Sequence, residues 1–193
     1  GVLSNLKMTL SGAESTTMDE YSSWERDCGL EYIMQSYDRE NVNKNVDTDF
    51  GQEEYDMVVK TIDTNIVQLV NRYPDVTFYL VYPPYSICYF DALVIKGTLD
   101  RQLRAEQTAT ELLLECPNVK LYNFFDRYDV ICNPDYYCDD GHYNAEVNSM
   151  MLSWISQDIG LVTKENYLDK LETEREFYSG YDYDSIYENL DKE

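Results

Sequence analysis

The strongest constraint on the fold is an unbroken β-branched and aromatic run, Val76-Thr77-Phe78-Tyr79-Leu80-Val81-Tyr82, which ends at Pro83-Pro84. A run of this kind without polar alternation is typical of a strand that is covered on both faces, as in a parallel sheet. The two prolines must end the hydrogen-bonding ladder, because proline has no N–H to donate. The run therefore predicts a central parallel strand.

Helical patterns flank this strand. Apolar residues recur at helical spacing from Gln52 to Tyr73, and a second amphipathic segment covers Thr98 to Glu115. A second strand, Val119 to Phe125, follows. Alternation of helices and strands favours right-handed crossovers, so we expect an α/β fold, a three-layer α/β/α sandwich with a mostly parallel, flavodoxin-like sheet and ligands at the carboxyl ends of its strands.

The two ends of the chain differ from this pattern. Residues 1–18 are a short apolar start followed by a small polar linker, and Asp19 to Tyr37 predicts a helix interrupted at Gly29. The segment after Pro84, with Tyr85, Ser86 and Asp91, is expected to be a loop. Residues 161–193 are acidic and rich in tyrosine, so we expect an α/β domain over residues 1–160 and, over 161–193, a solvated extension that partly packs its tyrosines on the body.

His142 is the only histidine in the 193 residues. Histidine is the side chain best suited to take and return a proton near neutral pH, so a base-assisted nucleophile would have to use it. Asp139 precedes it by three residues across a glycine turn and is a candidate orienting partner. Apolar residues at helical spacing follow, so both lie on a loop that opens a helix. A surface histidine beside a helix capped by Asn144 explains the same residues equally well.

The formal charge of -22 limits the partners. A surface this acidic repels nucleic acid and anionic membranes, so neither is expected to bind. No stretch reaches the roughly 18 apolar residues of a membrane-spanning helix, so the chain itself is expected to be soluble, without membrane insertion.

The five cysteines lack C-x-x-C spacing, and with one histidine they predict neither a metal site nor a redox motif. Cys132 and Cys138 flank one loop and would be able to pair in an exported protein, although an odd count fits reduced, buried thiols as well. Cys28, Cys88 and Cys116 fall in apolar or helical settings and are expected to be reduced. No cofactor is expected.

Taken in order, these segments resemble the C-terminal two-thirds of an SGNH/GDSL-type hydrolase, in particular the SGNH-like proteins of bacterial cell-surface polysaccharide loci. The similarity covers roughly residues 17 to 157. It rests on the strand that ends in Pro83-Pro84, the strand Val119 to Phe125, the segment Asp19-Glu20-Tyr21-Ser22-Ser23-Trp24, and an Asp-x-x-His loop running into Tyr143-Asn144-Ala145-Glu146-Val147-Asn148.

The resemblance implies that Asp139, or alternatively Asp140, orients His142 as the general base that activates a serine. It also implies that Ser86, Tyr85 and Tyr143 line the substrate pocket. The sequence has no Gly-Asp-Ser, Gly-x-Ser-x-Gly or Gly-x-Asn-Asp block. We therefore expect the nucleophile and the first strand or strands of the sheet to lie outside this chain, which would be inactive alone.

Two functions follow from the resemblance. The first is an esterase or O-acyltransferase for acylated cell-surface carbohydrate, whose parent protein is anchored outside the membrane and whose exposed sheet edge favours a homo-oligomer. The second is a non-catalytic carbohydrate-binding or assembly module, in which the acidic surface meets a basic partner and the sugar contacts come from tyrosines, namely Tyr82, Tyr85, Tyr89 and Tyr143.

Overall fold

A computed structural model describes residues 27–188, which form a mixed α/β fold around a small sheet. Strands β1 (Phe78–Tyr82) and β2 (Val119–Asn123) pair in parallel, with Phe78 opposite Val119 and Tyr82 opposite Asn123. The short β3 (Leu161–Val162) pairs antiparallel with the other side of β2. The predicted mixed α/β class and the parallel pairing of the two strands are thus confirmed.

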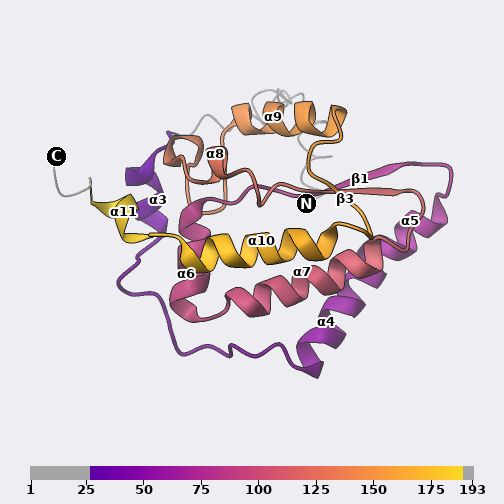
Figure 1. Ribbon diagram of the computed structural model, residues 1–193, viewed down its shortest axis with the longest axis horizontal. Helices are drawn as coiled ribbons and strands as arrows, with labels where there is room; N and C mark the ends of the chain where they lie inside the picture. The colour runs from indigo at the N-terminus through magenta and orange to yellow at the C-terminus, as the bar shows by residue number, and fades with distance from the viewer. Residues whose placement is uncertain (1–26, 189–193) are drawn as a thin grey trace, which may run out of the picture.

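The helices are arranged on both faces of this sheet (Figure 1). In chain order they are α3 (Leu30–Ser36), α4 (Gln52–Ile62), the π-helical η1 (Asp63–Val67), α5 (Gln68–Arg72), α6 (Ile87–Lys96), α7 (Leu99–Leu113), α8 (Tyr128–Ile131), the 3-10 helix η2 (Pro134–Tyr136), α9 (Ala145–Ser156), α10 (Tyr167–Gly180) and α11 (Asp184–Tyr187).

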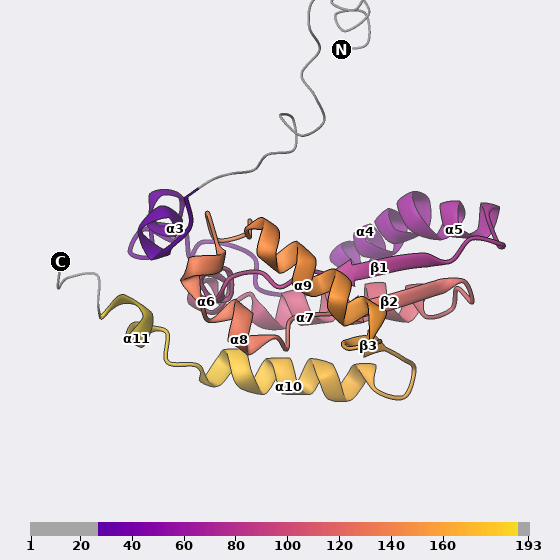
Figure 2. The same cartoon turned by 90° about the horizontal axis from the view of Figure 1, so that it is seen from above.

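Helices α4, α7 and α10 lie on one side of the sheet and α9 on the other, as Figures 1 and 2 show. The side chains divide in the same way. On the first side, Leu121 and Val162 pack with Leu113 of α7. On the second, Tyr122 and Phe124 pack with Met151 of α9. The sheet therefore contributes alternate residues to two apolar layers, as the period of a strand requires.

The prediction that the first strand is central and covered on both faces is wrong for the part of the chain that the structure describes. There β1 pairs only with β2, and residues Tyr79 and Val81 are 54% and 38% exposed. The physical reason is the position of α9, which packs on Tyr122 and Phe124 rather than on β1. Among residues 27–188, a β-branched and aromatic run thus forms an edge strand with one uncovered face.

Two further segments differ from expectation. The segment after Ser86 is helix α6, not a loop, and it is capped by Gly97, whose φ of 71° suits glycine. The long helix from Gln52 is present, but it contains the π-helical segment Asp63–Val67 before it ends at Arg72. The predictions for residues 1–18 and for Asp19 to Trp24 lie outside the described residues.

Residues 161–188 pack against the rest of the fold. Strand β3 joins the sheet, and α10 packs beside α7. Tyr178 of α10 is fully buried, and its hydroxyl donates to the carbonyl oxygen of Phe125 at 2.6 Å. Within the described part of the chain, no helix is both long and apolar enough to cross a membrane.

A buried carboxylate joins three helical segments. Asp91 of α6 is 1% exposed and accepts hydrogen bonds from the hydroxyls of Tyr37 and Tyr187 at 2.9 and 3.0 Å. The Nε atom of Arg39 donates to the same carboxylate at 2.7 Å, and its Nη1 atom pairs with Asp184 at 2.7 Å. These contacts tie the end of α3 and helix α11 to α6.

Candidate functional site

The loop that bears His142 is held by main-chain hydrogen bonds at both ends. The N–H of Cys138 donates to the carbonyl of His142 at 2.8 Å, and the N–H of Asn144 donates to the carbonyl of Tyr136 at 2.8 Å. Asn144 then caps α9, since its side chain accepts from the N–H groups of Glu146 and Val147 at 3.1 and 3.3 Å. The loop is therefore a closed turn directly before a capped helix.

Within this turn the carboxylate of Asp139 contacts the imidazole of His142. Its Oδ2 and Oδ1 atoms lie 2.8 and 2.9 Å from Nδ1 of the ring. Oδ1 also accepts from the N–H groups of Gly141 and His142 at 2.9 and 2.7 Å. The His142 side chain is 67% exposed and that of Asp139 only 20%. The carboxylate thus orients the ring through Nδ1.

The electrostatics of the turn favour an ionised Asp139. Partial burial acts to raise the pKa of this carboxyl, but the N–H groups of Gly141 and His142 and the imidazole donate to it and hold its pKa below the usual value. Asp140 is placed differently, because its carbonyl oxygen accepts from the hydroxyl of Ser86 at 2.8 Å. Of the two candidate orienting residues, Asp139 is the one that contacts the ring.

Ser86 lies beneath the loop, at the start of α6. It is 1% exposed, and both its N–H, at 3.3 Å, and its hydroxyl, at 2.8 Å, donate to the carbonyl oxygen of Asp140. The hydroxyl of buried Tyr137 donates to the carbonyl of Pro84 at 2.8 Å. The end of β1 and the His142 loop are therefore joined, and Ser86 positions the loop through its backbone.

The predicted pocket tyrosines divide into two groups. The ring of Tyr85 lies 4.7 Å from that of Tyr89 and 6.0 Å from that of Phe125. Tyr143 is half-buried, and its pKa is raised by that burial and by the nearby Tyr85. Tyr82 instead meets the Thr110 hydroxyl of α7 at 3.1 Å. Tyr85, Tyr89 and Tyr143 thus lie beside the loop, whereas Tyr82 contacts both layers, because its ring also stacks on that of Phe125 at 6.0 Å.

No metal site accompanies these residues in the part of the chain that the structure describes, where no three His, Cys, Asp or Glu side chains converge. Asp126, which follows β2, forms ion pairs with Arg127 at 2.8 Å and Lys170 at 2.9 Å. Its carboxylate therefore links the end of β2 to α10 through the ion pair with Lys170.

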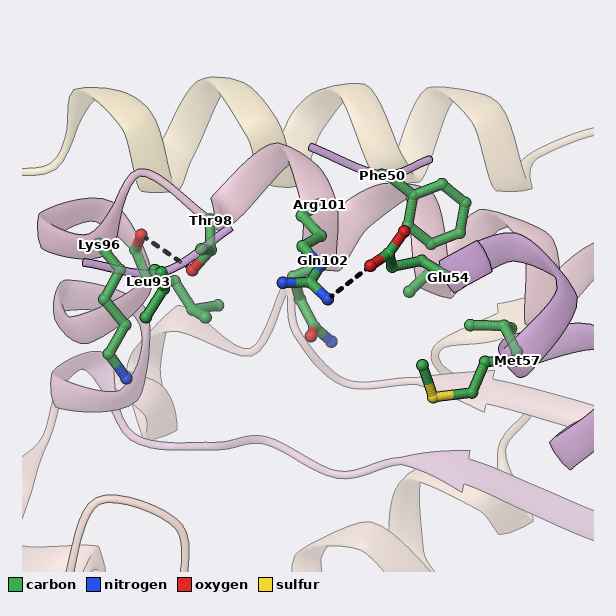
Figure 3. A pocket seen from close by; sticks show the side chains of 11 residues that line it. Phe50, Glu54, Met57, Leu93, Lys96, Thr98, Arg101 and Gln102 are labelled. Carbon is green, nitrogen blue, oxygen red and sulfur yellow. Dashed lines mark hydrogen bonds and ion pairs between the residues drawn. The ribbon is translucent and has the colours of Figure 1, made fainter. Parts of the chain in front are cut away.

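A groove of about 370 Å³ lies between α4, α6, α7 and the segment before α4 (Figure 3). Its walls include Phe50, Met57 and Leu93. Figure 3 shows Arg101 reaching toward Glu54, and the two side chains pair at 3.3 Å. The groove contains none of the residues of the His142 loop, so it is not the site that the sequence predicts.

Sequence reasoning missed a buried carboxyl pair. Asn123, at the end of β2, donates through Nδ2 to Oε1 of Glu106 on α7 at 2.7 Å and to Oε1 of Glu174 on α10 at 2.8 Å. The two carboxyls are 5% and 1% exposed. Burial raises the pKa of Glu106 to about 8 and that of Glu174 to about 9. No pattern in the sequence distinguishes them from the surface glutamates of the same helices.

Comparison of the chain with protein-family models, with curated proteins and with solved structures finds no match.

Proposed function

We propose that this chain is the histidine-bearing part of an SGNH/GDSL-type esterase or O-acyltransferase that acts on acylated cell-surface carbohydrate. In this proposal His142 is the general base, Asp139 orients it, and the nucleophilic serine lies outside the chain. The fold would be the SGNH-type sandwich, and the parent protein would be anchored on the extracytoplasmic side of a membrane. Neutral acylated sugar is a substrate that the acidic surface does not repel.

The observation that carries the proposal is the contact of both Asp139 carboxylate oxygens with Nδ1 of an exposed imidazole. A carboxylate on Nδ1 selects the tautomer in which Nε2 is able to accept a proton from a hydroxyl nucleophile, and it stabilises the imidazolium that forms. The loop also adjoins Ser86, beyond the end of β1. Sites in α/β folds are commonly built beyond the carboxyl ends of parallel strands.

The test uses the longer protein, if the same reading frame encodes a Gly-Asp-Ser-like block upstream. There His142→Ala is expected to lower kcat/KM for an acetylated sugar roughly 10²- to 10⁴-fold, because general base catalysis is lost. Asp139→Asn is expected to reduce it by a comparable factor, since the amide favours the wrong tautomer. Asp135→Asn, an exposed position in η2, serves as the matched control and should leave kcat/KM unchanged.

The chain of 193 residues alone is expected to hydrolyse simple acetyl esters no faster than its own His142→Ala variant. Turnover that disappears in this variant would show that the nucleophile lies within the chain, and Ser86→Ala would then be the next variant. Full activity of the longer protein carrying His142→Ala would overturn the proposed role of the histidine.

A non-catalytic carbohydrate-binding module is the second candidate. The observation that favours it is the pair of half-buried rings of Tyr85 and Tyr89, which lie 4.7 Å apart beside the loop, because such rings stack on the apolar faces of sugars. In this case Tyr85→Ala would abolish sugar binding measured by calorimetry. His142→Ala would leave that binding unchanged, and neither protein would turn over an ester.

A second copy of the chain is the partner that we propose for β1. This strand pairs only with β2 among the described residues, and it exposes Tyr79 and Val81. Edge strands of this kind associate with one another unless they carry charge. We expect dimers by light scattering at high protein concentration in salt, and monomers for Val81→Lys. Leu152→Lys, at an exposed position of α9, is the control that should still dimerise, and a monomeric unmodified chain would contradict the proposal.

A further inference from the structure

Two cysteines that are distant in the sequence meet beside the His142 loop. The Sγ atoms of Cys28 and Cys138 lie 2.8 Å apart, although 110 positions separate the residues. Cys28 stands two residues before α3, and Cys138 stands directly before Asp139. The structure therefore places Cys28 against a second thiol rather than in the apolar setting that its sequence neighbourhood predicts.

The backbone on both sides holds this contact in place. The N–H of Gly29 donates to the carbonyl of Tyr137 at 3.0 Å, so the residues next to the two cysteines are already joined. Ile33 of α3 and Tyr137 are both 0% exposed and belong to the same apolar cluster. A disulfide bond is about 2 Å long, so the sulfur atoms need to approach by less than roughly 1 Å from positions that the backbone already fixes.

The remaining cysteines lie in other surroundings. Cys88 accepts from the hydroxyl of Tyr187 at 3.5 Å, Cys116 meets the carbonyl of Leu112 at 3.9 Å, and Cys132 lies beside Tyr181. The pairing of Cys132 with Cys138, which their positions on one loop suggest, is therefore not the one that the structure favours.

We propose that Cys28 and Cys138 are an oxidation site, at which a low-molecular-weight disulfide such as oxidised glutathione converts the two thiols into an intramolecular disulfide. One cysteine thiolate attacks a glutathione sulfur and releases one glutathione thiolate, which gives a mixed disulfide. The second cysteine loses its proton and attacks the protein sulfur of that bond, which releases the second glutathione. The two protein protons end on two reduced glutathione molecules, so atoms and electrons balance.

The disulfide ties the segment before α3 to the Asp139–His142 turn, whether or not that turn is catalytic. Burial and the contact with Cys138 raise the pKa of Cys28 to about 12. Because the thiolate is the reacting form, cross-linking is expected to be slow at neutral pH and to accelerate as the pH rises.

The experiment treats the whole chain with oxidised glutathione at alkaline pH, alkylates the remaining thiols under denaturing conditions and maps the peptides by mass spectrometry. The expected result is three alkylated cysteines in place of five and a linked peptide that contains Cys28. The Cys132→Ser variant should retain the link, and Cys138→Ser should lose it. Closing so long a loop should raise the Tm by roughly 5 to 15 °C, and reduction should reverse the rise.

The peptide map of the unmodified chain decides the matter even if a serine variant fails to fold. Five alkylated cysteines after prolonged oxidation would overturn the proposal. A link that persists in Cys138→Ser would assign the partner of Cys28 to another cysteine, and a link between two chains would replace the intramolecular bond; either result also rejects it.

Discussion

The free energy of unfolding is expected to fall steadily between about pH 4.5 and about pH 9, because two buried carboxyls keep their protons in the folded chain. Glu106 and Glu174 have pKa values raised by burial from 4.5 to about 8 and about 9. The two carboxyls also face each other, so an ionised Glu106 raises the pKa of Glu174; Asp126 raises it further, and Lys170 lowers both pKa values. Desolvation outweighs the single lysine, so neutral carboxyls are the stable form.

The sign of the effect follows from proton counting. Above about pH 4.5 the unfolded chain has released both protons, whereas the folded chain holds them until about pH 8 and about pH 9. The unfolded state therefore binds fewer protons in this window, and the free energy of unfolding decreases by about 1.4 kcal/mol per pH unit for each proton retained. Below about pH 4.5 both states are protonated and this dependence disappears.

Urea denaturation at several pH values between about 5 and about 9 measures this slope. Glu106→Gln is expected to remove the contribution of about one retained proton to this slope, which is about 1.4 kcal/mol per pH unit. The variant should therefore be more stable than the unmodified protein at alkaline pH. Glu176→Gln, at an exposed position of α10, is the matched control and should leave the slope unchanged. Equal stability at both ends of the range would show that the carboxyls titrate as exposed groups do.

Replacement of Arg39 by methionine is expected to lower the free energy of unfolding by about 3 to 5 kcal/mol, because it leaves the buried carboxylate of Asp91 without a cation. The hydroxyls of Tyr37 and Tyr187 would remain as donors, but neither carries a charge. Methionine keeps much of the apolar stem, so the loss reports mainly on the charge. The free energy of unfolding of Arg39→Lys should lie between those of the unmodified protein and Arg39→Met, since one ammonium group cannot match the two-sided hydrogen bonding of a guanidinium.

A double-mutant cycle isolates this interaction. Combining Arg39→Met with Asp91→Asn should recover part of the loss, because the unpaired charge is removed. Arg101→Met, which breaks an ion pair with Glu54 at the surface groove, is the control and should lower the free energy of unfolding by no more than about 1 kcal/mol. A loss for Arg39→Met no larger than that of the control would mean that Asp91 is adequately satisfied by the two tyrosines.

The features that sequence predicted well depend on neighbouring residues. Val119 to Phe125 and the run ending at Tyr82 signal strands locally, and the helical segment between them favours a crossover, so their parallel pairing follows. The contact of Asp139 with His142 joins residues three positions apart, and the turn that brings them together leads directly into a helix that Asn144 caps. Whether this pair acts in catalysis stays a prediction.

The features that sequence could not reveal depend on distant partners. Glu106 resembles any glutamate of an amphipathic helix, and only Asn123 and Glu174, brought by two other elements, make its site buried. The residues around Cys28 in the sequence do not predict its contact with Cys138, which lies 110 positions away. The exposure of Tyr79 reflects where α9 packs, which the strand itself does not specify. The residue pattern of a segment predicts its local structure, but it does not predict which of its surfaces another segment will cover.

The attachment of the His142 turn to the end of β1 has an evolutionary consequence. Its inner side is anchored through carbonyl oxygens, with Ser86 bound to that of Asp140 and Tyr137 bound to that of Pro84. Because a main-chain carbonyl is present whatever the side chain, the anchor at position 140 places no demand on the identity of that residue. Substitution of Asp140 during evolution can therefore alter the charge and shape of the His142 loop, while the imidazole keeps its place relative to the sheet.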